Sequence, residues 1–297
     1  MFTGLSAFPH SPLRDDVFDE ASYAAQIARL VAAGVDSITA LGSTGSYMYL
    51  DREERRRVAH TAVQHAGEVP VMVGIGALRT SLVQRLADDA QEAGASAVLL
   101  APVTYAALGD DEVFGLFEDV TAGLSVPLVV YDNPGTTHVT FSDELYARIA
   151  TLPNVASIKI PGVPADPGEA RARVESIRAH VPAGVTVGVS GDAAAATGLN
   201  AGCDVWYSVI GGTLPEAALR ITRAARSGDA AAATAESERL EPLWALFREF
   251  SSYRVTAAIA EHLGFAAPDS LPRPVRGLGP AARDTVARVV DELDLRS

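Results

Sequence analysis

The sequence of 297 residues predicts an α/β fold, a (β/α)8 TIM barrel with a C-terminal helical appendage. Short apolar runs rich in β-branched residues alternate with longer Ala-rich amphipathic segments. This pattern is typical of parallel strands that are buried on both faces and joined by helices. Eight such units follow one another, which is the number that closes a barrel. About 70 residues remain after the eighth helix, and their pattern indicates further helices.

The predicted strands are apolar along most of their length. They cover residues 4–8, 36–41, 69–75, 96–101, 126–132, 155–160, 184–190 and 204–210. The predicted helices between them cover 19–33, 51–66, 80–93, 110–123, 141–151 and 167–180, and the eighth ends near residue 226. Asp51 is the expected N-cap of the helix that carries the charged run "DREERRR", and Gly34 is expected to end the helix before it.

A doubly wound open sheet is the alternative fold. It seldom contains eight such regular units, and no G-x-G-x-x-G motif follows the first strand, since "GIGALRT" at 74–80 has only half of one. The sequence therefore predicts a barrel over residues 1–226 and a helical extension packed on the barrel over 227–297. The extension has the pattern of three helices, at 229–249, 251–264 and 280–294, with the Pro-rich link "APDSLPRPV" between the last two.

Charge and composition narrow the classes of partner. The net charge of −13 disfavours nucleic acid and anionic membrane surfaces, because phosphate contacts need a basic surface. The single cysteine, Cys203, is expected to be a small buried residue; it allows no disulfide within the chain and no structural zinc site of the usual kind. The N-terminus lacks the basic region of a signal peptide, and no apolar stretch has the length of a membrane span, so a cytoplasmic protein is expected.

Lys159 is the residue that most strongly indicates a function. Lys159 is the single lysine among 24 lysine and arginine residues, and it lies at the end of the sixth predicted strand, in "SIKIPG". Barrel active sites lie at the carboxyl ends of the strands. Desolvation lowers the pKa of a lysine, and the neutral amine is a nucleophile toward carbonyls, which an arginine cannot become. The alternative is a lysine that extends to solvent or pairs with a carboxylate.

Other polar side chains are expected at the same edge of the barrel. Tyr131 ends the fifth strand and is either a packing residue or a proton relay. The segment "GSTGS" at 42–46 follows the second strand and is either an ordinary turn or a nest of N–H and hydroxyl groups for a carboxylate. Asp192 follows the seventh strand, in "SGDA", and Ser208 lies near the end of the eighth.

Together these motifs resemble those of the dihydrodipicolinate synthase / N-acetylneuraminate lyase family of class I aldolases, over the whole chain. "GSTGS" with the following Leu50–Glu54 segment, of the form L-x-x-E-E, is similar to the family's G-T-T-G-E loop. "YDNPGTT" is similar to its Y-N-x-P element, "SIKIPG" to its G-I-K-E/D strand, and "SGDA" to its S/G-x-D element.

The resemblance implies the roles of several residues. Lys159 is expected to form a Schiff base with C2 of pyruvate or a related 2-keto acid, and Tyr131 to relay protons. Ser43 and Thr44 are expected to hold the carboxylate of the keto acid. Tyr105, or Thr104 one residue earlier, is expected to supply a second relay group from the neighbouring subunit. No metal or organic cofactor is implied, and members are commonly homotetramers built as dimers of dimers.

Departures from the family pattern bear on the substrate. The family's arginine after Y-N-x-P is absent, since Gly135, Thr136 and Thr137 occupy that stretch, which predicts that aspartate semialdehyde is a poor substrate. Asp132 replaces the motif's Asn, and Ser46 replaces the loop's Glu.

We therefore expect a Schiff-base lyase that cleaves or dehydrates a 2-keto-3-deoxy sugar acid or a related hydroxylated acid. Thr136, Thr137, Asp192 and Ser208 are the candidate ligands of its hydroxyls. The first alternative is dihydrodipicolinate synthase itself, with a clamp for the second substrate supplied from elsewhere. The second alternative is a non-catalytic paralogue that binds a keto acid.

Overall fold

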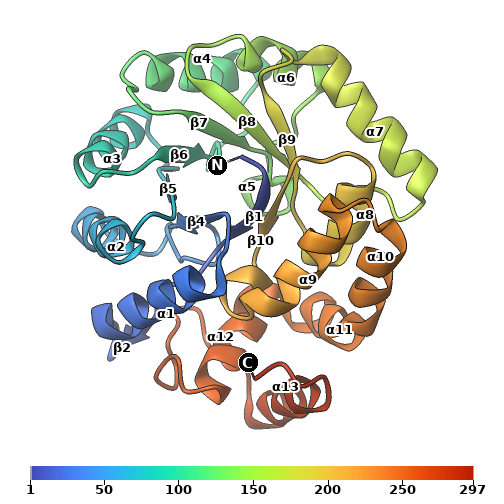
Figure 1. The fold of residues 1–297 in the computed structure, drawn as a ribbon. Coiled ribbons are helices and arrows are strands. Elements are labelled where there is room, and N and C mark those ends of the chain that lie inside the picture. Colours follow the sequence, from blue (N-terminus) through green and yellow to red (C-terminus); the bar gives the residue numbers. More distant parts are fainter. Residues whose placement is uncertain (1, 297) are drawn as a thin grey trace.

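Eight parallel strands close into a barrel in the computed structural model, which describes residues 2–296 (Figure 1). The strands are β1 (Gly4–Ala7), β4 (Ser37–Ala40), β5 (Val71–Gly74), β6 (Ala97–Leu100), β7 (Leu128–Tyr131), β8 (Val155–Ile160), β9 (Thr186–Val189) and β10 (Val205–Ser208). Each strand pairs with its neighbours in chain order, and β1 completes the barrel by pairing with both β10 and β4. The prediction of a (β/α)8 barrel with eight strands at these places is confirmed.

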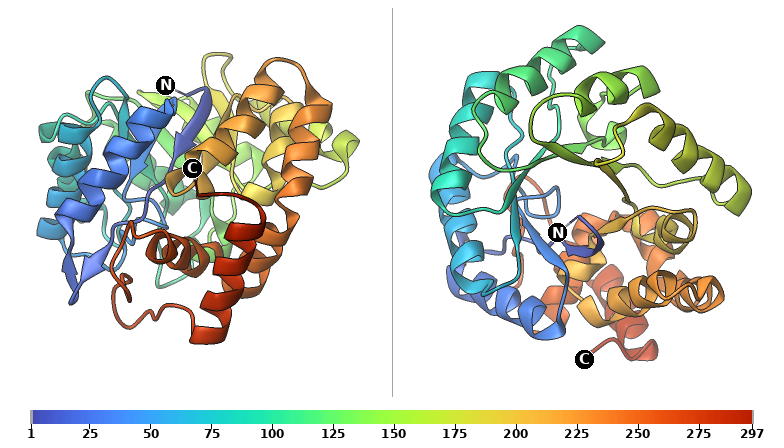
Figure 2. Two further views of the ribbon diagram at one scale, coloured as in Figure 1. Left: turned by 60° about the horizontal axis from the view of Figure 1, so that its bottom comes forward. Right: turned by 45° about the horizontal axis from the view of Figure 1, so that its top comes forward.

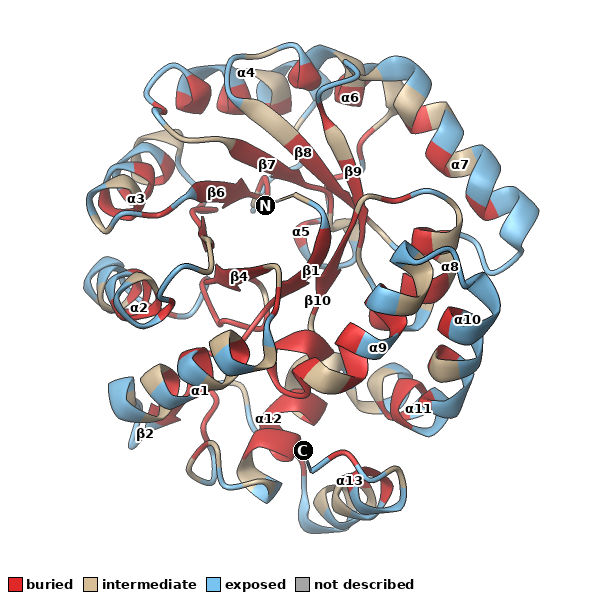
Figure 3. Ribbon diagram, in the orientation of Figure 1, coloured by how far each residue is buried: buried red, intermediate tan, exposed pale blue. Residues whose placement is uncertain are grey.

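Helices surround the barrel and bury the face that is turned toward it, while their outer faces are exposed (Figure 3). They are α1 (Glu20–Ala33), α2 (Arg52–His65), α3 (Thr80–Glu92), α4 (Asp110–Thr121), α6 (Asp143–Ala150), α7 (Pro167–His180), α8 (Ala195–Asn200) and α9 (Pro215–Arg226). The predicted helices agree with these bounds apart from their ends. None of the described helices is long and apolar enough to span a membrane.

The predicted capping residues at two helix ends are confirmed. The Asp51 side chain accepts from the N–H of Glu54, and the Glu54 side chain accepts from the N–H of Asp51, so a reciprocal capping box begins α2. Gly34 ends α1 with φ of 77° and donates its N–H to the carbonyls of Leu30 and Val31. Such a left-handed residue strongly favours glycine, because a Cβ is strained there.

Several short elements outside the eight barrel strands were not predicted from the sequence. They are the hairpin of β2 (Leu13–Arg14) and β3 (Val17–Phe18), the single-turn helix α5 (Pro134–Thr137), and the 3₁₀ turns η1 (Asp192–Ala194) and η2 (Ile210–Gly212). Three of them, α5, η1 and η2, directly follow the carboxyl ends of β7, β9 and β10. They therefore shape the edge of the barrel where the predicted site lies.

The C-terminal extension contains four helices in the described chain, where three were predicted. They are α10 (Ala230–Arg239), α11 (Glu241–Phe250), α12 (Ser252–His262) and α13 (Pro280–Glu292). The predicted helix 229–249 is wrong as one element, since it breaks at Leu240. Pro242 accounts for the break, because proline has no N–H to donate and its ring clashes with the preceding turn of a continuous helix.

The extension lies against the barrel (Figure 2). α10 packs on α8 and α9, and α11 contacts η1 beyond the end of β9. The predicted boundary after residue 226 falls in the turn between α9 and α10. The division into a barrel and an extension remains a prediction, but α11 brings the extension to the edge of the barrel that carries the candidate site.

The inside of the barrel has its own packed cluster. It contains Phe8, Met72, Ala97, Leu99, Ala101, Val129, Tyr131, Val205 and Tyr207. Residues two apart on a strand point to the same side, as Val129 and Tyr131 do on β7. Tyr207 fills space next to Gly188 on β9, where a Cβ would lie 2.4 Å from the ring of Tyr207. Cys203 lies outside this cluster and is buried, as predicted.

Candidate active site

A cavity of about 510 Å³ opens at the carboxyl ends of the strands. Six of the eight candidate residues from the sequence line it, and they are Ser43, Thr44, Tyr131, Thr136, Lys159 and Asp192. Tyr105 and Ser208 do not line it. Most of the residues that were predicted from their positions at the carboxyl ends of strands therefore lie around one cavity.

Lys159 lies on β8 at the base of this cavity and is 2% exposed. Its Nζ lies 3.8 Å from the ring centroid of Tyr131, 3.9 Å from that of Phe8 and 5.9 Å from that of Tyr207. Burial lowers the pKa of Lys159 to about 7, and the charge of Asp192 opposes part of that shift. The expectation of a desolvated lysine holds, whereas a lysine that extends to solvent is contradicted by this burial.

Tyr131 ends β7 directly beside Lys159, since the two residues are register partners on adjacent strands. Its hydroxyl lies 3.4 Å from Ser43 Oγ, and Asn133 Nδ2 donates to the same Oγ at 3.4 Å. Burial raises the pKa of Tyr131 to about 12, so the phenol keeps its proton at neutral pH. Tyr131 is therefore a proton donor within reach of a group bound to Lys159, with Ser43 as its hydrogen-bond partner.

The loop 42–46 is held from both sides. Thr44 Oγ1 donates to the carbonyl of Phe8 at 3.3 Å, and Ser11 Oγ donates to the carbonyl of Gly45 at 2.9 Å. Ser46 Oγ lies 2.6 Å from the hydroxyl of Tyr253 on α12, which ties the loop to the C-terminal extension. In the described part of the chain the backbone N–H groups of Ser43 and Thr44 have no hydrogen-bond acceptor. Such free donors beside a lysine are suited to a carboxylate.

Asp192 and Ser208 have their polar atoms engaged within the protein. Asp192 Oδ1 accepts from Trp206 Nε1 at 3.0 Å, Ser208 Oγ at 3.2 Å and the N–H of Val209 at 3.1 Å, and its Oδ2 accepts from the N–H of Ile210 at 2.7 Å. Burial raises the pKa of Asp192 to about 6, although each of these hydrogen bonds acts to lower it. The carboxylate thus joins the ends of β9 and β10.

Ser208 is fully buried, and its Oγ also accepts from the N–H of Gly211 at 2.8 Å. The expectation that Ser208 contacts a substrate hydroxyl is not met by this arrangement. The sequence shows that a serine ends a strand, but it does not show that the following 3₁₀ turn uses the hydroxyl.

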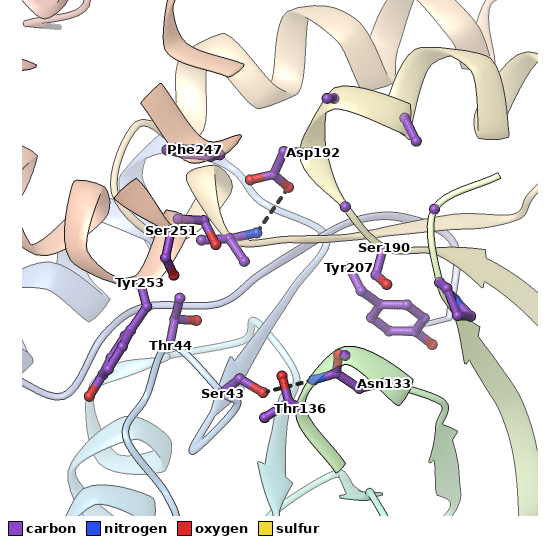
Figure 4. Close-up of a pocket in the computed structure, with 18 of the residues that line it drawn as sticks. Ser43, Thr44, Asn133, Thr136, Ser190, Asp192, Tyr207, Phe247, Ser251 and Tyr253 are labelled. Atoms are coloured by element: carbon purple, nitrogen blue, oxygen red, sulfur yellow. Dashed lines mark hydrogen bonds between the residues drawn. The ribbon is translucent and has the colours of Figure 1, made fainter. Parts of the chain in front are cut away.

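Figure 4 shows Ser43, Asn133 and Thr136 on one side of the cavity and Asp192, Phe247 and Ser251 on the other. Thr136 is exposed on the turn of α5, where the family resemblance places an arginine, so this side presents hydroxyl and amide groups. The hydroxyl of Thr137 donates to the carbonyl of Asn133, and Thr137 does not line the cavity.

Tyr105 lies in the loop after β6 and is 98% exposed. A side chain so exposed has no packing partner within the described chain and reaches no group of the cavity. Its role as a relay group from a neighbouring subunit, and the choice between Tyr105 and Thr104, stay predictions.

Several cavity residues were missed from the sequence. Tyr207 lies on β10, one residue before the carboxyl end of that strand, so its position in the predicted strand could have identified it. Those from the extension are Trp244, Phe247, Arg248, Ser251, Ser252 and Tyr253. No sequence signal placed these, because only the packing of α11 on η1 brings them to the barrel. Within residues 2–296, no group of three or more His, Cys, Asp or Glu side chains is placed to hold a metal ion.

Comparisons with known proteins identify the family of the chain. The model of the Dihydrodipicolinate synthetase family matches residues 1–293. A 4-hydroxy-tetrahydrodipicolinate synthase of Phenylobacterium zucineum is 31% identical over 99% of this chain and 98% of its own. A crystal structure of dihydrodipicolinate synthase from Agrobacterium tumefaciens is 44% identical, covers 98% of both chains and superposes with a TM-score of 0.94.

A dihydrodipicolinate synthase from Acinetobacter baumannii, solved in complex with pyruvate, shares the fold at 22% identity, with a TM-score of 0.89 over 99% of this chain and all of that chain. The family match over residues 1–293, the barrel and the buried lysine beside a strand-end tyrosine lead to one conclusion. The chain belongs to the dihydrodipicolinate synthetase family and is a lyase of the class I aldolase type.

Proposed function

We propose that the protein forms a Schiff base between Lys159 and C2 of a 2-keto acid and cleaves or dehydrates a 2-keto-3-deoxy sugar acid or a related hydroxylated acid. The observation that carries this proposal is the amine of Lys159, buried under three aromatic rings with a pKa of about 7, beside Tyr131. A neutral amine attacks a keto carbon, and the protonated imine that follows withdraws electrons from C3.

The steps assign a role to each nearby group. The amine of Lys159 adds to C2, the resulting hydroxyl leaves as water after protonation, and Tyr131 carries protons to and from that oxygen. The free N–H groups of Ser43 and Thr44 hold the C1 carboxylate. In cleavage, the C4 hydroxyl gives its proton to a base, the C3–C4 bond breaks to an aldehyde, and its electrons enter the imine as an enamine. Thr136 is placed to bind a hydroxyl of the substrate.

Trapping with borohydride tests the proposal. The protein is incubated with pyruvate and reductant, and its intact mass and peptide map are measured. One adduct at Lys159 is expected, because the only other amine of the chain is the N-terminus. Lys159→Met is the control and should lose the adduct. If neither pyruvate nor a panel of longer keto acids modifies Lys159, the proposal is wrong.

A second candidate is 4-hydroxy-tetrahydrodipicolinate synthase, which is favoured by the names of the relatives. Complementation of a diaminopimelate auxotroph would support it, whereas failure at good expression would count against it. A non-catalytic keto-acid-binding protein is the third candidate. It would bind pyruvate without exchanging the methyl protons with solvent, which proton NMR in deuterium oxide measures.

We also propose a homotetramer built from dimers, with Tyr105 reaching a neighbouring subunit. Exposed apolar side chains follow three consecutive strands: Met48 and Tyr49 after β4, Leu78 after β5 and Tyr105 after β6. Exposed apolar side chains that follow neighbouring strands are suited to contact with a second copy of the chain. Light scattering measures the mass, and Tyr105→Phe should slow proton exchange at bound pyruvate if Tyr105 acts as a relay.

A further inference from the structure

One helix of the C-terminal extension presents a continuous stripe of side chains to the cavity. Trp244, Phe247 and Arg248 of α11 and Ser251 just beyond it all line the cavity. Their spacing of three and four residues places them on one face of a helix. Ser251 has φ of 71°, a left-handed conformation that is uncommon for serine and ends the helix at the cavity. Figure 4 shows Phe247 and Ser251 on the same side of the cavity as Asp192, so this face forms part of the wall.

Arg248 changes the charge of that wall. The charged lining residues are Lys159, Arg248 and Asp192. Lys159 is buried at the base, and Asp192 has both oxygens engaged by four hydrogen bonds from Trp206, Ser208, Val209 and Ile210. Arg248 is therefore the one cation of the described lining that solvent and the outer part of a bound molecule both reach, since its side chain is 58% exposed.

Glu241, the ion-pair partner of Arg248, competes only weakly with an anion bound in the cavity. Arg248 Nη2 pairs with Glu241 Oε1, two turns earlier on α11, and Glu241 does not line the cavity. Both side chains are more than half exposed, at 58% and 57%. Exposed ion pairs of this kind contribute little to stability, so an anion within the cavity can replace Glu241 at small cost. The guanidinium has the planar donor pair that binds a carboxylate with two parallel hydrogen bonds.

We infer that Arg248 binds a carboxylate at the end of the substrate opposite the keto acid, so that the preferred substrates are dicarboxylic 2-keto acids. This inference rests on the proposed function, because Arg248 can bind the distal carboxylate only if Lys159 holds the keto end of the same molecule. Thr136, on the turn of α5, brings no charge of its own. A phosphate, which carries close to two negative charges at neutral pH, is less well matched to a single exposed arginine.

Matched keto acids test the inference without knowledge of the natural substrate. The probes are 2-oxoglutarate against 2-oxopentanoate and 2-oxoadipate against 2-oxohexanoate, which differ within each pair by the distal carboxylate. Pyruvate is the reference without a distal group. The measured quantity is the concentration of each acid that gives half-maximal cyanoborohydride trapping at Lys159. In the wild type, at least one dicarboxylate should bind roughly 10-fold or more tightly than its neutral-ended partner.

Two substitutions break the same ion pair and separate recognition from a structural role. Arg248→Gln should abolish the preference for the dicarboxylate. Glu241→Gln should keep or increase it, by up to about fivefold, because it frees the guanidinium. A merely structural pair would change the preference in the same direction in both variants. Arg288→Gln is the matched control, since it removes an exposed arginine paired with Glu292 on α13, away from the cavity.

The outcomes are distinct. If pyruvate modifies Lys159 but the wild type shows no preference in either pair, or if Arg248→Gln keeps the preference, the inference about Arg248 is wrong and the proposed function stands. If no keto acid modifies Lys159, the proposed function fails and the inference fails with it.

Discussion

Replacing Lys159 by methionine should make the protein more stable, not less. The folded protein holds the pKa of Lys159 at about 7 instead of its ordinary 10.5, because burial disfavours the charged amine. The folded pKa lies below the unfolded one, so between these values the unfolded chain binds more protons and stability rises with pH. The full cost of desolvation, on the order of 5 kcal/mol, applies below pH 7 and disappears above about pH 10.5.

These values set the size of the effect. At pH 7 the amine costs the folded state about 4 kcal/mol, and at pH 9 about 2 kcal/mol. Methionine has a similar length and no charge, so Lys159→Met should raise the free energy of unfolding by up to those amounts. Lys159→Arg is the contrasting variant. Because arginine does not lose its proton, it should be less stable than the wild type at both pH values.

Denaturant titration of the three proteins at pH 7 and pH 9 measures the effect. Groups common to the wild type and the methionine variant cancel in the difference between them. The difference should shrink by about 2 kcal/mol from pH 7 to pH 9. A difference that does not depend on pH, or a methionine variant that is less stable at pH 7, would refute the view that Lys159 is held neutral at the expense of stability.

Three further predictions concern the same region. The rate of imine formation with pyruvate should rise with pH up to about 7 and then level off, because the neutral amine of Lys159 is the reacting form; a rate that rises steadily to pH 10 contradicts this. Tyr131→Phe should still bind pyruvate but slow exchange of its methyl protons by about 10²–10⁴-fold, followed by NMR; an unchanged rate excludes the relay. Gly188→Ala should destabilise the protein by about 1–3 kcal/mol in denaturant titration, because the new Cβ lies 2.4 Å from the ring of Tyr207, and Tyr207→Leu in the same chain should restore part of the loss.

The strands and the residues at their ends were the predictable part of the molecule. The continuous apolar runs indicate the strands of a closed parallel barrel, because both faces of each such strand are buried. Lys159 and Tyr131 followed from this, since adjacent parallel strands bring their carboxyl ends to one edge, and the structure makes them register partners. A period of two along a strand also decides which side chains face inward, which is why a strand-end position is informative.

Two parts of the site could not be predicted, and each has a physical reason. Ser208 ends a strand as expected, but its hydroxyl is taken by Asp192 and by the N–H of Gly211 in the following turn. Turn hydrogen bonds of this kind depend on three-dimensional proximity and leave no periodic pattern. Arg248 lies 89 residues after Lys159 in the sequence. Only the packing of α11 on η1 brings it to the same cavity.

The aromatic surroundings of Lys159 suit the cation that forms during the reaction better than the ammonium from which it comes. An ammonium is compact and strongly hydrated, so burial costs it heavily and the amine becomes neutral. A protonated imine spreads its charge over nitrogen and carbon and has fewer N–H groups to hydrate. The rings of Phe8 and Tyr131, whose centroids lie 3.9 and 3.8 Å from Nζ, attract either cation through their π faces. Burial therefore penalises the free ammonium more than the bound iminium, while the rings favour both. The same packing that lowers the pKa of the lysine thus favours the covalent complex over the free protonated enzyme.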